Sequence, residues 1–347
     1  MKISTFAIEQ RIAAFVKLGQ TLKLLAQTET WNDVLQEAYA HNPWFTVDNI
    51  NFAWQIIVQN LQANELFNWL QNYELTQPPV PKKIGVLAAG NIPLVCFQDV
   101  LCVLVSGHNL YLKMSSEDNI LPRLVLNKLV EIAPEFASKI HYVEQLKGVE
   151  AIIATGSDTS ARHFRYYFRH IPNIIRHNRN SVAVLSGKET AQEIQLLADD
   201  IFRYFGLGCR SVTKLYVPEN YDFTFLLDNF EPWRERITQH YKYNNNYDYH
   251  KALFLLNKTP HLDNGFLLVT QDPAFASPIG VLHYEIYQDI AQVIIQLKQN
   301  TEKIQCIVSH IDLPLPRIPF GQTQMPKLWD YADNIDILEF LIQLSAV

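Results

Sequence analysis

The chain has 347 residues, a length that suits two domains better than a single core. Hydrophobic residues make up 48% of it and charged residues 18%, which is the composition of a globular protein and excludes overall disorder. The 29 basic and 35 acidic side chains give a formal charge of −6, so net charge does not attract nucleic acid. We expect no nucleic-acid partner.

The start of the chain lacks both a continuous apolar stretch and a small-residue cleavage site, so we expect no signal peptide. The most apolar stretch, residues 94–106, is interrupted by Gln98 and Asp99 and is too short to span a bilayer. These features predict a cytoplasmic protein with no membrane span. The cysteines form no C-x-x-C pair and show no zinc-type Cys/His spacing, so neither a disulfide nor a metal site is expected.

Helices are expected first along the chain. Apolar residues near helical spacing predict one through Ile8 and Leu25, and a second helical region covers about residues 49–70. The proline-rich segment 77–81 ends this region. Strands then alternate with helices: strands at 84–88, 109–113, 140–143 and 151–154, and helices at 94–105, 119–132 and 158–168. This alternation predicts βαβ crossovers and a doubly wound, mostly parallel sheet, which binds nucleotides at the carboxyl ends of its strands.

A second α/β unit follows. Its expected elements are strands at 181–185 and 213–217 with a helix at 189–205 between them, continuing through 252–256 and 304–309. Residues 241–249, which include three consecutive asparagines, are interpreted as a polar loop.

Cys209 lies in a polar loop, in the segment Gly206-Leu207-Gly208-Cys209-Arg210. The glycines permit close approach of a substrate, and a nearby guanidinium or helix terminus lowers a thiol pKa and favours the nucleophilic thiolate. The other three cysteines, Cys96, Cys102 and Cys306, lie in apolar segments, where cysteine usually behaves as a small hydrophobe. Cys209 is therefore the candidate nucleophile, and the alternative is a small loop residue without chemistry.

Polar residues follow two of the predicted strands. Asn91, in Ala88–Pro93, either donates its amide to an oxyanion or caps the next helix. Lys113 and Ser115 end the second strand and suit the hydroxyls or phosphate of an adenosine ribose, or else form a solvated lysine and a helix cap.

A third strand end, Thr155-Gly156-Ser157, stands directly before a helix, where backbone N–H groups and the helix dipole favour an anion. Beyond it, a basic segment without acidic residues contains Arg162, Arg165, Arg169, Arg176 and Arg179 with His163, His170 and His177. The segment suits the phosphates of NADPH or coenzyme A, or is a solvated helix face. Its aromatic residues also permit a nucleic-acid interpretation, although core packing explains them more simply.

Taken in order, these motifs resemble the aldehyde dehydrogenase superfamily and, within it, the fatty acyl-CoA reductases of the bacterial bioluminescence type. The matching segments cover about residues 80–345 and are Asn91–Pro93, Leu112–Ser115, Thr155–Ser157, Asn180–Val184, Gly206–Cys209, Ile279–Leu282 and Pro319–Gly321. The resemblance implies an α/β, aldehyde-dehydrogenase-like fold and division into three parts. These are 1–178, with N-terminal helices and a nucleotide-binding domain, 179–318, the catalytic domain carrying Cys209, and 319–347, a tail that returns to the body or forms an oligomer contact.

The resemblance also implies a reaction. Cys209 attacks an acyl thioester, the Asn91 amide and the Cys209 N–H hold the oxyanion, and coenzyme A leaves. NADPH, or possibly NADH, then reduces the acyl-cysteine to an aldehyde. The cofactor-binding residues implied are Lys113, Ser115, Thr155, Gly156, Ser157, Arg162 and Phe320. The partner is a small-molecule acyl-CoA or an acyl-carrier thioester, and a homo-oligomer is expected.

Two departures from the family pattern bear on the activity. The glutamate that activates water in aldehyde oxidisers is absent from the corresponding stretch 175–179, where His177 is a candidate proton donor or base. A later glutamate, which holds the nicotinamide ribose, is absent around 275–278. The sequence therefore favours a reductase of acyl thioesters over an oxidiser of aldehydes. The alternatives are a cysteine-dependent acyltransferase or thioesterase, and a non-catalytic relative that binds nucleotides or RNA.

Overall fold

Four helices begin the chain in the structure, a computed structural model that describes residues 7–75 and 80–345. They are α1 (Ile8–Leu25), α2 (Glu29–His41), α3 (Val47–Asn60) and α4 (Ala63–Leu70). The helix predicted through Ile8 and Leu25 is confirmed as α1. The region predicted at 49–70 is two helices, because the chain turns at Leu61 and Gln62, and α2 was not predicted. Most of the proline-rich segment 77–81 lies outside the described residues.

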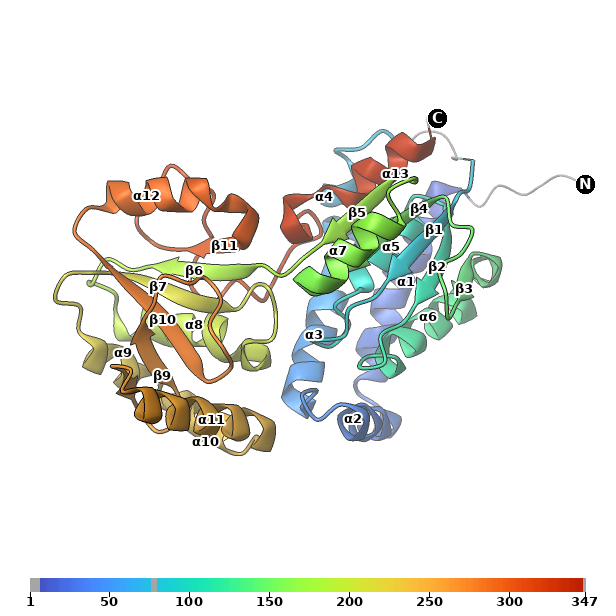
Figure 1. Cartoon of the computed structure of the whole chain (residues 1–347). Helices are drawn as coiled ribbons and strands as arrows, with labels where there is room; N and C mark the ends of the chain where they lie inside the picture. Colours follow the sequence, from blue (N-terminus) through green and yellow to red (C-terminus); the bar gives the residue numbers. More distant parts are fainter. Residues whose placement is uncertain (1–6, 76–79, 346–347) are drawn as a thin grey trace, which may run out of the picture. The chain divides into compact units, whose positions relative to one another are not determined.

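The alternating segment forms a five-stranded parallel sheet, as predicted (Figure 1). Its strand order is β3-β2-β1-β4-β5. The elements are β1 (Lys83–Leu87), α5 (Phe97–Val105), β2 (Asn109–Lys113), α6 (Ile120–Ile132), β3 (Ile140–Tyr142), β4 (Ala151–Thr155), α7 (Asp158–Tyr167) and β5 (Asn173–Arg176). Helix α5 begins three residues later than predicted, after a left-handed Leu94 with φ of 59°. Strand β5 was not predicted.

Side chains of this sheet alternate between two hydrophobic layers. Val86, Leu112 and Ile153 belong to the core that includes residues of α1, α5 and α6. Ile152 and Ala154 point the other way and pack with side chains of the α7 region. The last helix, α13 (Ile337–Ser345), packs against α5, so the C-terminal segment Pro326–Val347 belongs with Met1–His177 in one compact unit. The sheet is thus covered on both faces, as a doubly wound fold requires.

Residues Asn178–Met325 form the second compact unit, around a six-stranded sheet in the order β11-β6-β7-β10-β9-β8. All its pairings are parallel except that of β8 with β9. Within this unit, α12 lies on one face of the sheet and α8 on the other (Figure 1). The elements are β6 (Asn180–Val184), α8 (Ala191–Phe202), β7 (Val212–Pro218), α9 (Phe223–Phe230), α10 (Arg234–Thr238), α11 (Tyr241–Asn257), β8 (Leu262–Asp263), β9 (Leu268–Gln271), β10 (Val281–Tyr287), α12 (Ile290–Gln299) and β11 (Ile304–Val308).

The prediction of a polar loop at 241–249 was wrong, because this segment belongs to α11, and residues 252–256, through which the α/β unit was expected to continue, belong to the same helix. The His240 ring caps this helix by accepting from the Tyr243 N–H at 3.2 Å. Tyr243 and Tyr247, one helical turn apart, are both buried. The burial of these two rings and the helix cap outweigh the weak helix propensity of the asparagines, so the segment is helical.

Candidate active site

The carboxyl edge of the first sheet brings together most of the residues predicted to bind a cofactor. Leu87, which ends β1, pairs with Lys113 on one side and Ala154 on the other. On one side of the β1/β4 boundary the chain passes from β1 outward to β2, and on the other side it passes from β4 outward to β5. The direction of chain progression thus reverses at this boundary, which is the topological switch point of the sheet. Open α/β sheets bind ligands at such points. The loops containing Asn91 and Gly156 follow these two strands directly.

A buried carboxylate fixes the loop after β1. Asp118 is only 3% exposed, and its Oδ2 accepts from the Leu94 N–H at 2.7 Å. Its Oδ1 has no hydrogen-bond partner among the described residues, and burial raises the pKa of Asp118 to about 7. In the same region a Cβ on Gly90 would come within 2.4 Å of the Ser115 Oγ, so only glycine fits. These contacts join the Asn91 loop to the loop after β2.

Three of the predicted cofactor residues have local structural partners. The Ser115 Oγ accepts from the Glu117 N–H at 3.1 Å, and the Ser157 Oγ caps α7 by accepting from the Ser160 N–H at 3.2 Å. Thr155 Oγ1 accepts from Arg176 at 3.4 Å. The bond of Ser115 is the local role that the sequence left open, and the capping bond of Ser157 and the Thr155–Arg176 bond are further structural roles.

The donors at this edge fit the phosphates and ribose hydroxyls of a dinucleotide. Lys113 is half-buried and Arg162 is exposed, and neither takes part in the ion pairs found among the described side chains. The start of α7, a ten-residue helix, adds the positive end of a helix dipole. The site thus offers two cations and a helix N-terminus on one unit.

The predicted basic cluster does not act as one surface. Arg176 is 5% exposed and forms a two-point ion pair with Asp99 of α5, at 2.8 and 2.9 Å. Arg179 donates to the carbonyl oxygens of Thr301 and Ile304. Neither guanidinium is therefore available to a phosphate in the way the sequence suggested. His177 is partly exposed directly after β5.

Cys209 follows an unusual turn in the second unit. Tyr204, Phe205 and Gly206 have φ values of 54°, 58° and 79°, three successive residues in the left-handed region. Such a conformation costs roughly 1–2 kcal/mol for each non-glycine residue. The Phe205 ring, 2% exposed, lies 4.2 Å from the His240 ring, and this packing holds the turn. The turn also explains why the helix predicted at 189–205 stops at Phe202.

The Cys209 loop is tied down by side chains on both sides. Cys209 is partly exposed, and its carbonyl accepts from the Ser181 hydroxyl at 3.1 Å. Ser211 N–H donates to the Gly208 carbonyl at 3.0 Å, and Gln324 Nε2 donates to the Ser211 Oγ at 3.3 Å. The neighbouring Arg210 guanidinium donates to the Cys306 Sγ at 3.4 Å. The loop therefore presents a partly exposed thiol on an ordered backbone.

A second buried carboxylate, Asp200 of α8, organises the segment that contains Phe320. Asp200 is fully buried and accepts from the Gly321 N–H at 2.7 Å, the Thr323 N–H at 3.0 Å and the Thr323 hydroxyl at 2.7 Å. Burial raises the pKa of Asp200 to about 6. Gln324 directly follows Thr323 in the chain and donates to Ser211, so the Asp200 carboxylate helps to fix the Cys209 loop through this segment. The structural role of Asp200 was not predicted from the sequence, although an aspartate at a buried position of a predicted helix is a signal for such a role.

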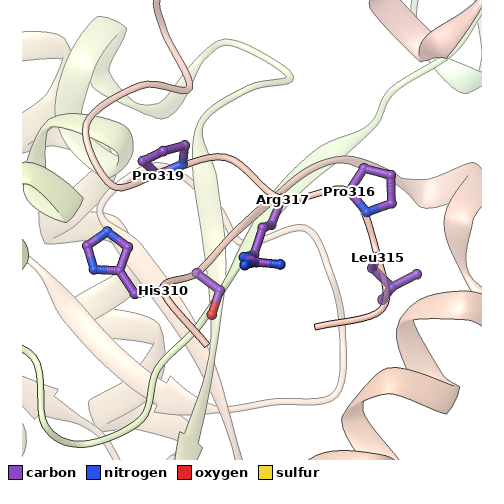
Figure 2. A pocket seen from close by; sticks show the side chains of 6 residues that line it. His310, Leu315, Pro316, Arg317 and Pro319 are labelled. Carbon is purple, nitrogen blue, oxygen red and sulfur yellow. The ribbon is translucent and has the colours of Figure 1, made fainter. Parts of the chain in front are cut away.

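Phe320 is 2% exposed, and its ring lies 4.5 Å from that of His310. His310 Nδ1 in turn contacts Glu193 Oε1 at 2.5 Å. An open pocket of about 520 Å³ adjoins these residues in the second unit, and Figure 2 shows Arg317 between His310 and Leu315 there. Its lining is Ser309, His310, Leu315, Pro316, Arg317 and Pro319. The pocket follows β11, at the carboxyl edge of the sheet, whereas Cys209 precedes β7 and lies at the amino edge.

Cys209 differs from the other three cysteines in its exposure to solvent. Cys96, Cys102 and Cys306 are buried, and burial raises the pKa of the Cys96 and Cys102 thiols well above the ordinary range. Within the described part of the chain, no cluster of three His, Cys, Asp or Glu residues could hold a metal ion. None of the helices there has both the length and the apolarity to cross a membrane.

The fold is that of the aldehyde dehydrogenases. Aldehyde dehydrogenase 21 from Physcomitrella patens, solved in complex with the reaction product succinate, matches with a TM-score of 0.71 and 12% identity over 98% of this chain and 84% of that one. An indole-3-acetaldehyde dehydrogenase with NAD+ matches with a TM-score of 0.66 and 12% identity, over 88% and 72%.

A Mycobacterium tuberculosis aldehyde dehydrogenase with NAD+ is similar at a TM-score of 0.60 and 14% identity, over 83% of this chain and 70% of that one. Neither a model of a protein family nor a curated relative matches the sequence. At such identities the similarity establishes the architecture, and the predicted fold class is confirmed.

Proposed function

We propose that the protein is an NAD(P)H-dependent reductase of acyl thioesters, such as acyl-CoA, that forms an aldehyde through an acyl group on Cys209. The observation that carries the proposal is the setting of this thiol. It is the partly exposed cysteine of the chain, on an ordered loop after a strained turn, in a fold whose solved examples include dehydrogenases with NAD+ bound.

The region where aldehyde oxidisers have their water-activating glutamate supports reduction over oxidation. In this chain that stretch contains Arg176, whose guanidinium is buried against Asp99. No carboxylate of the stretch is available to activate water toward an acyl-enzyme. The acyl group on Cys209 would then persist until it is reduced or passed to another thiol.

In the proposed reaction the Cys209 thiolate attacks the thioester carbonyl carbon. The carbonyl π electrons move to oxygen and then return to re-form the carbonyl as the bond from carbon to the leaving sulfur breaks, and the leaving thiolate takes up a proton equal to the one that the Cys209 thiol gave up. The acyl group stays on the Cys209 Sγ, and the backbone N–H of Cys209 is the proposed donor to the oxyanion. Release of the aldehyde after reduction returns the Cys209 thiolate.

The cofactor is proposed to lie at the carboxyl edge of the first sheet. Lys113, Ser115 and the start of α7 at Thr155–Ser157 would hold its ribose and phosphates, with Arg162 as a further cation. When bound, the reduced nicotinamide supplies the hydride. NADPH is preferred to NADH in this proposal because Lys113 and Arg162 offer positive charge for an extra phosphate. His177 is retained as a proposed proton donor.

The test follows NADPH absorbance with a panel of acyl-CoA thioesters, with intact-protein mass spectrometry after acyl-CoA alone. We expect cysteine-dependent oxidation and a mass gain of one acyl group, both lost in Cys209→Ser. Cys306→Ser is the matched control, since serine keeps an acceptor for Arg210. Acylation without NADPH oxidation would indicate acyl transfer or hydrolysis instead. A native protein that gains no acyl mass would contradict the proposal altogether.

A further inference from the structure

Helix α7 exposes a pair of aromatic rings that the proposed reaction does not use. Tyr166 is 71% exposed and Tyr167 is 64% exposed. The exposed Arg169 places its guanidinium carbon 4.6 Å from the centre of the Tyr166 ring, and its Nε donates to the His170 ring at 2.9 Å. Exposed aromatic side chains next to arginine are enriched at protein interfaces, where they supply much of the binding energy.

The segment that carries these rings is basic, although Glu144 and Glu150 are exposed beside the loop 146–149. From Thr159 to Lys188 the sequence contains no aspartate or glutamate. Arg165 and Arg169 are both exposed, and neither forms an ion pair with a carboxylate in the part of the chain that the structure describes. Because the chain as a whole has a charge of −6, this is a positive surface on a negative molecule.

A small pocket adjoins the same surface. It has a volume of about 200 Å³ and is lined by Leu146, Lys147, Gly148, Val149, Tyr167, Phe168, His170 and Ile171. Its walls are mostly apolar, and the cation Lys147 is exposed at its edge. Pockets for whole cofactors are larger, from about 300 Å³ upward. This one suits a single apolar side chain of a partner.

The surface lies away from the proposed cofactor site. Residues 146–149 come just before β4, and the end of α7 comes just before β5, so the pocket lies at the amino edge of the sheet. Gly156 lies at the opposite edge, beyond the five residues of β4, which is roughly 15 Å of strand. A ligand of the pocket is therefore distinct from a dinucleotide on the strand ends.

We propose that Arg165, Arg169, Lys147 and the Tyr166–Tyr167 pair form a docking surface for an acidic protein that carries the acyl thioester, with one apolar side chain of that protein in the pocket. This proposal rests on the proposed function and names the source of its substrate. Charge complementarity selects the occupant. A second copy related by a two-fold axis would bring the same arginines toward each other, and like charges across an interface oppose association.

The test compares two substrates, a fatty acyl-CoA and the same acyl group on the phosphopantetheine arm of an acidic acyl carrier protein. The variant is Arg165→Glu/Arg169→Glu. Its matched control is Lys17→Glu/Lys23→Glu, which reverses two exposed lysines of α1 and changes the net charge equally. For the α7 variant we expect at least about a tenfold rise in KM for the carrier substrate, with kcat/KM for acyl-CoA unchanged and the control like the native protein.

Direct titration of the carrier by calorimetry keeps this test independent of the reaction. Native affinity should fall as salt rises from about 50 to about 300 mM, and the α7 variant should lose about tenfold at low salt. If no thioester is reduced but the carrier still binds through α7, the function fails and the docking surface stands. Any of four results would overturn the docking proposal. The variant could lose equal activity with both substrates or lose none with either. The surface could bind an RNA oligomer in place of the carrier, or the variant could change its oligomeric state.

Discussion

Replacement of Asp118 by asparagine should change how the stability of the first unit depends on pH. Burial raises the pKa of this carboxyl from 3.8 to about 7 in the folded protein. A difference of about 3 pKa units corresponds to about 4 kcal/mol between the protonated and ionised states. This free energy favours folding below the unfolded pKa and is lost as the pH rises through about 7, since the folded state then also gives up its proton.

Asparagine at this position keeps an oxygen that can accept from the Leu94 N–H, and it does not titrate. We therefore expect Asp118→Asn to gain stability relative to the native protein between about pH 4 and about pH 7, by about 1 kcal/mol per pH unit. Asp118→Ala removes the acceptor and should in addition cost about 1–3 kcal/mol at every pH, because the Leu94 N–H is left without its partner.

The assay is urea unfolding followed by tryptophan fluorescence. Of the six tryptophans, only Trp233 lies in the second unit, so the signal reports mainly on the unit that contains Asp118. The quantity compared is the difference in unfolding free energy between variant and native protein, in which other titrating groups cancel. A difference that stays constant from about pH 4 to about pH 8 would refute the assignment of a buried, titrating carboxyl.

Two other changes test further buried charges. Asp200→Ala removes the acceptor of the Gly321 and Thr323 N–H groups and should lower the free energy of unfolding by about 2–4 kcal/mol, measured by chemical unfolding. The same change should alter the rate at which iodoacetamide alkylates Cys209. The control Thr323→Ser keeps the hydroxyl and should match the native protein. Asp99→Ala leaves the Arg176 guanidinium buried without its carboxylate and should lower the free energy of unfolding by about 3–5 kcal/mol. The double change Asp99→Leu/Arg176→Met removes both charges and should lower it by less. Equal losses of stability in the two variants would contradict the argument from buried charge.

The order of strands and helices was largely predictable, because short apolar segments alternating with helical patterns are a local signal. The residues at the edge of the first sheet follow from that order alone, since Lys113 ends a strand of one parallel sheet and Asn91 and Gly156 each come after one. Parallel strands necessarily place such residues at one edge. The positions of these candidates needed no knowledge of side-chain contacts.

Features decided by tertiary packing were not predictable. The asparagine-rich start of α11 has poor helix propensity, and the burial of Tyr243 and Tyr247 together with the His240 cap favours the helix. The basic segment that begins in α7 has one composition but three environments. Arg165 is exposed, Arg176 is paired with Asp99 and Arg179 binds carbonyl groups, and the partners of Arg176 and Arg179 are distant in the sequence.

The two units share one physical device beside their candidate residues. In each, a buried carboxylate accepts backbone N–H groups of a functional loop, Asp118 for the Asn91 loop and Asp200 for the segment that supports the Cys209 loop. Burying a carboxylate costs free energy unless hydrogen bonds compensate for it, and the raised pKa values of both groups show incomplete compensation. An amide or hydroxyl would accept the same bonds at lower cost. The ionised form makes stronger bonds to N–H donors, and this is a physical reason for a carboxylate at positions that fix the loops of the candidate residues.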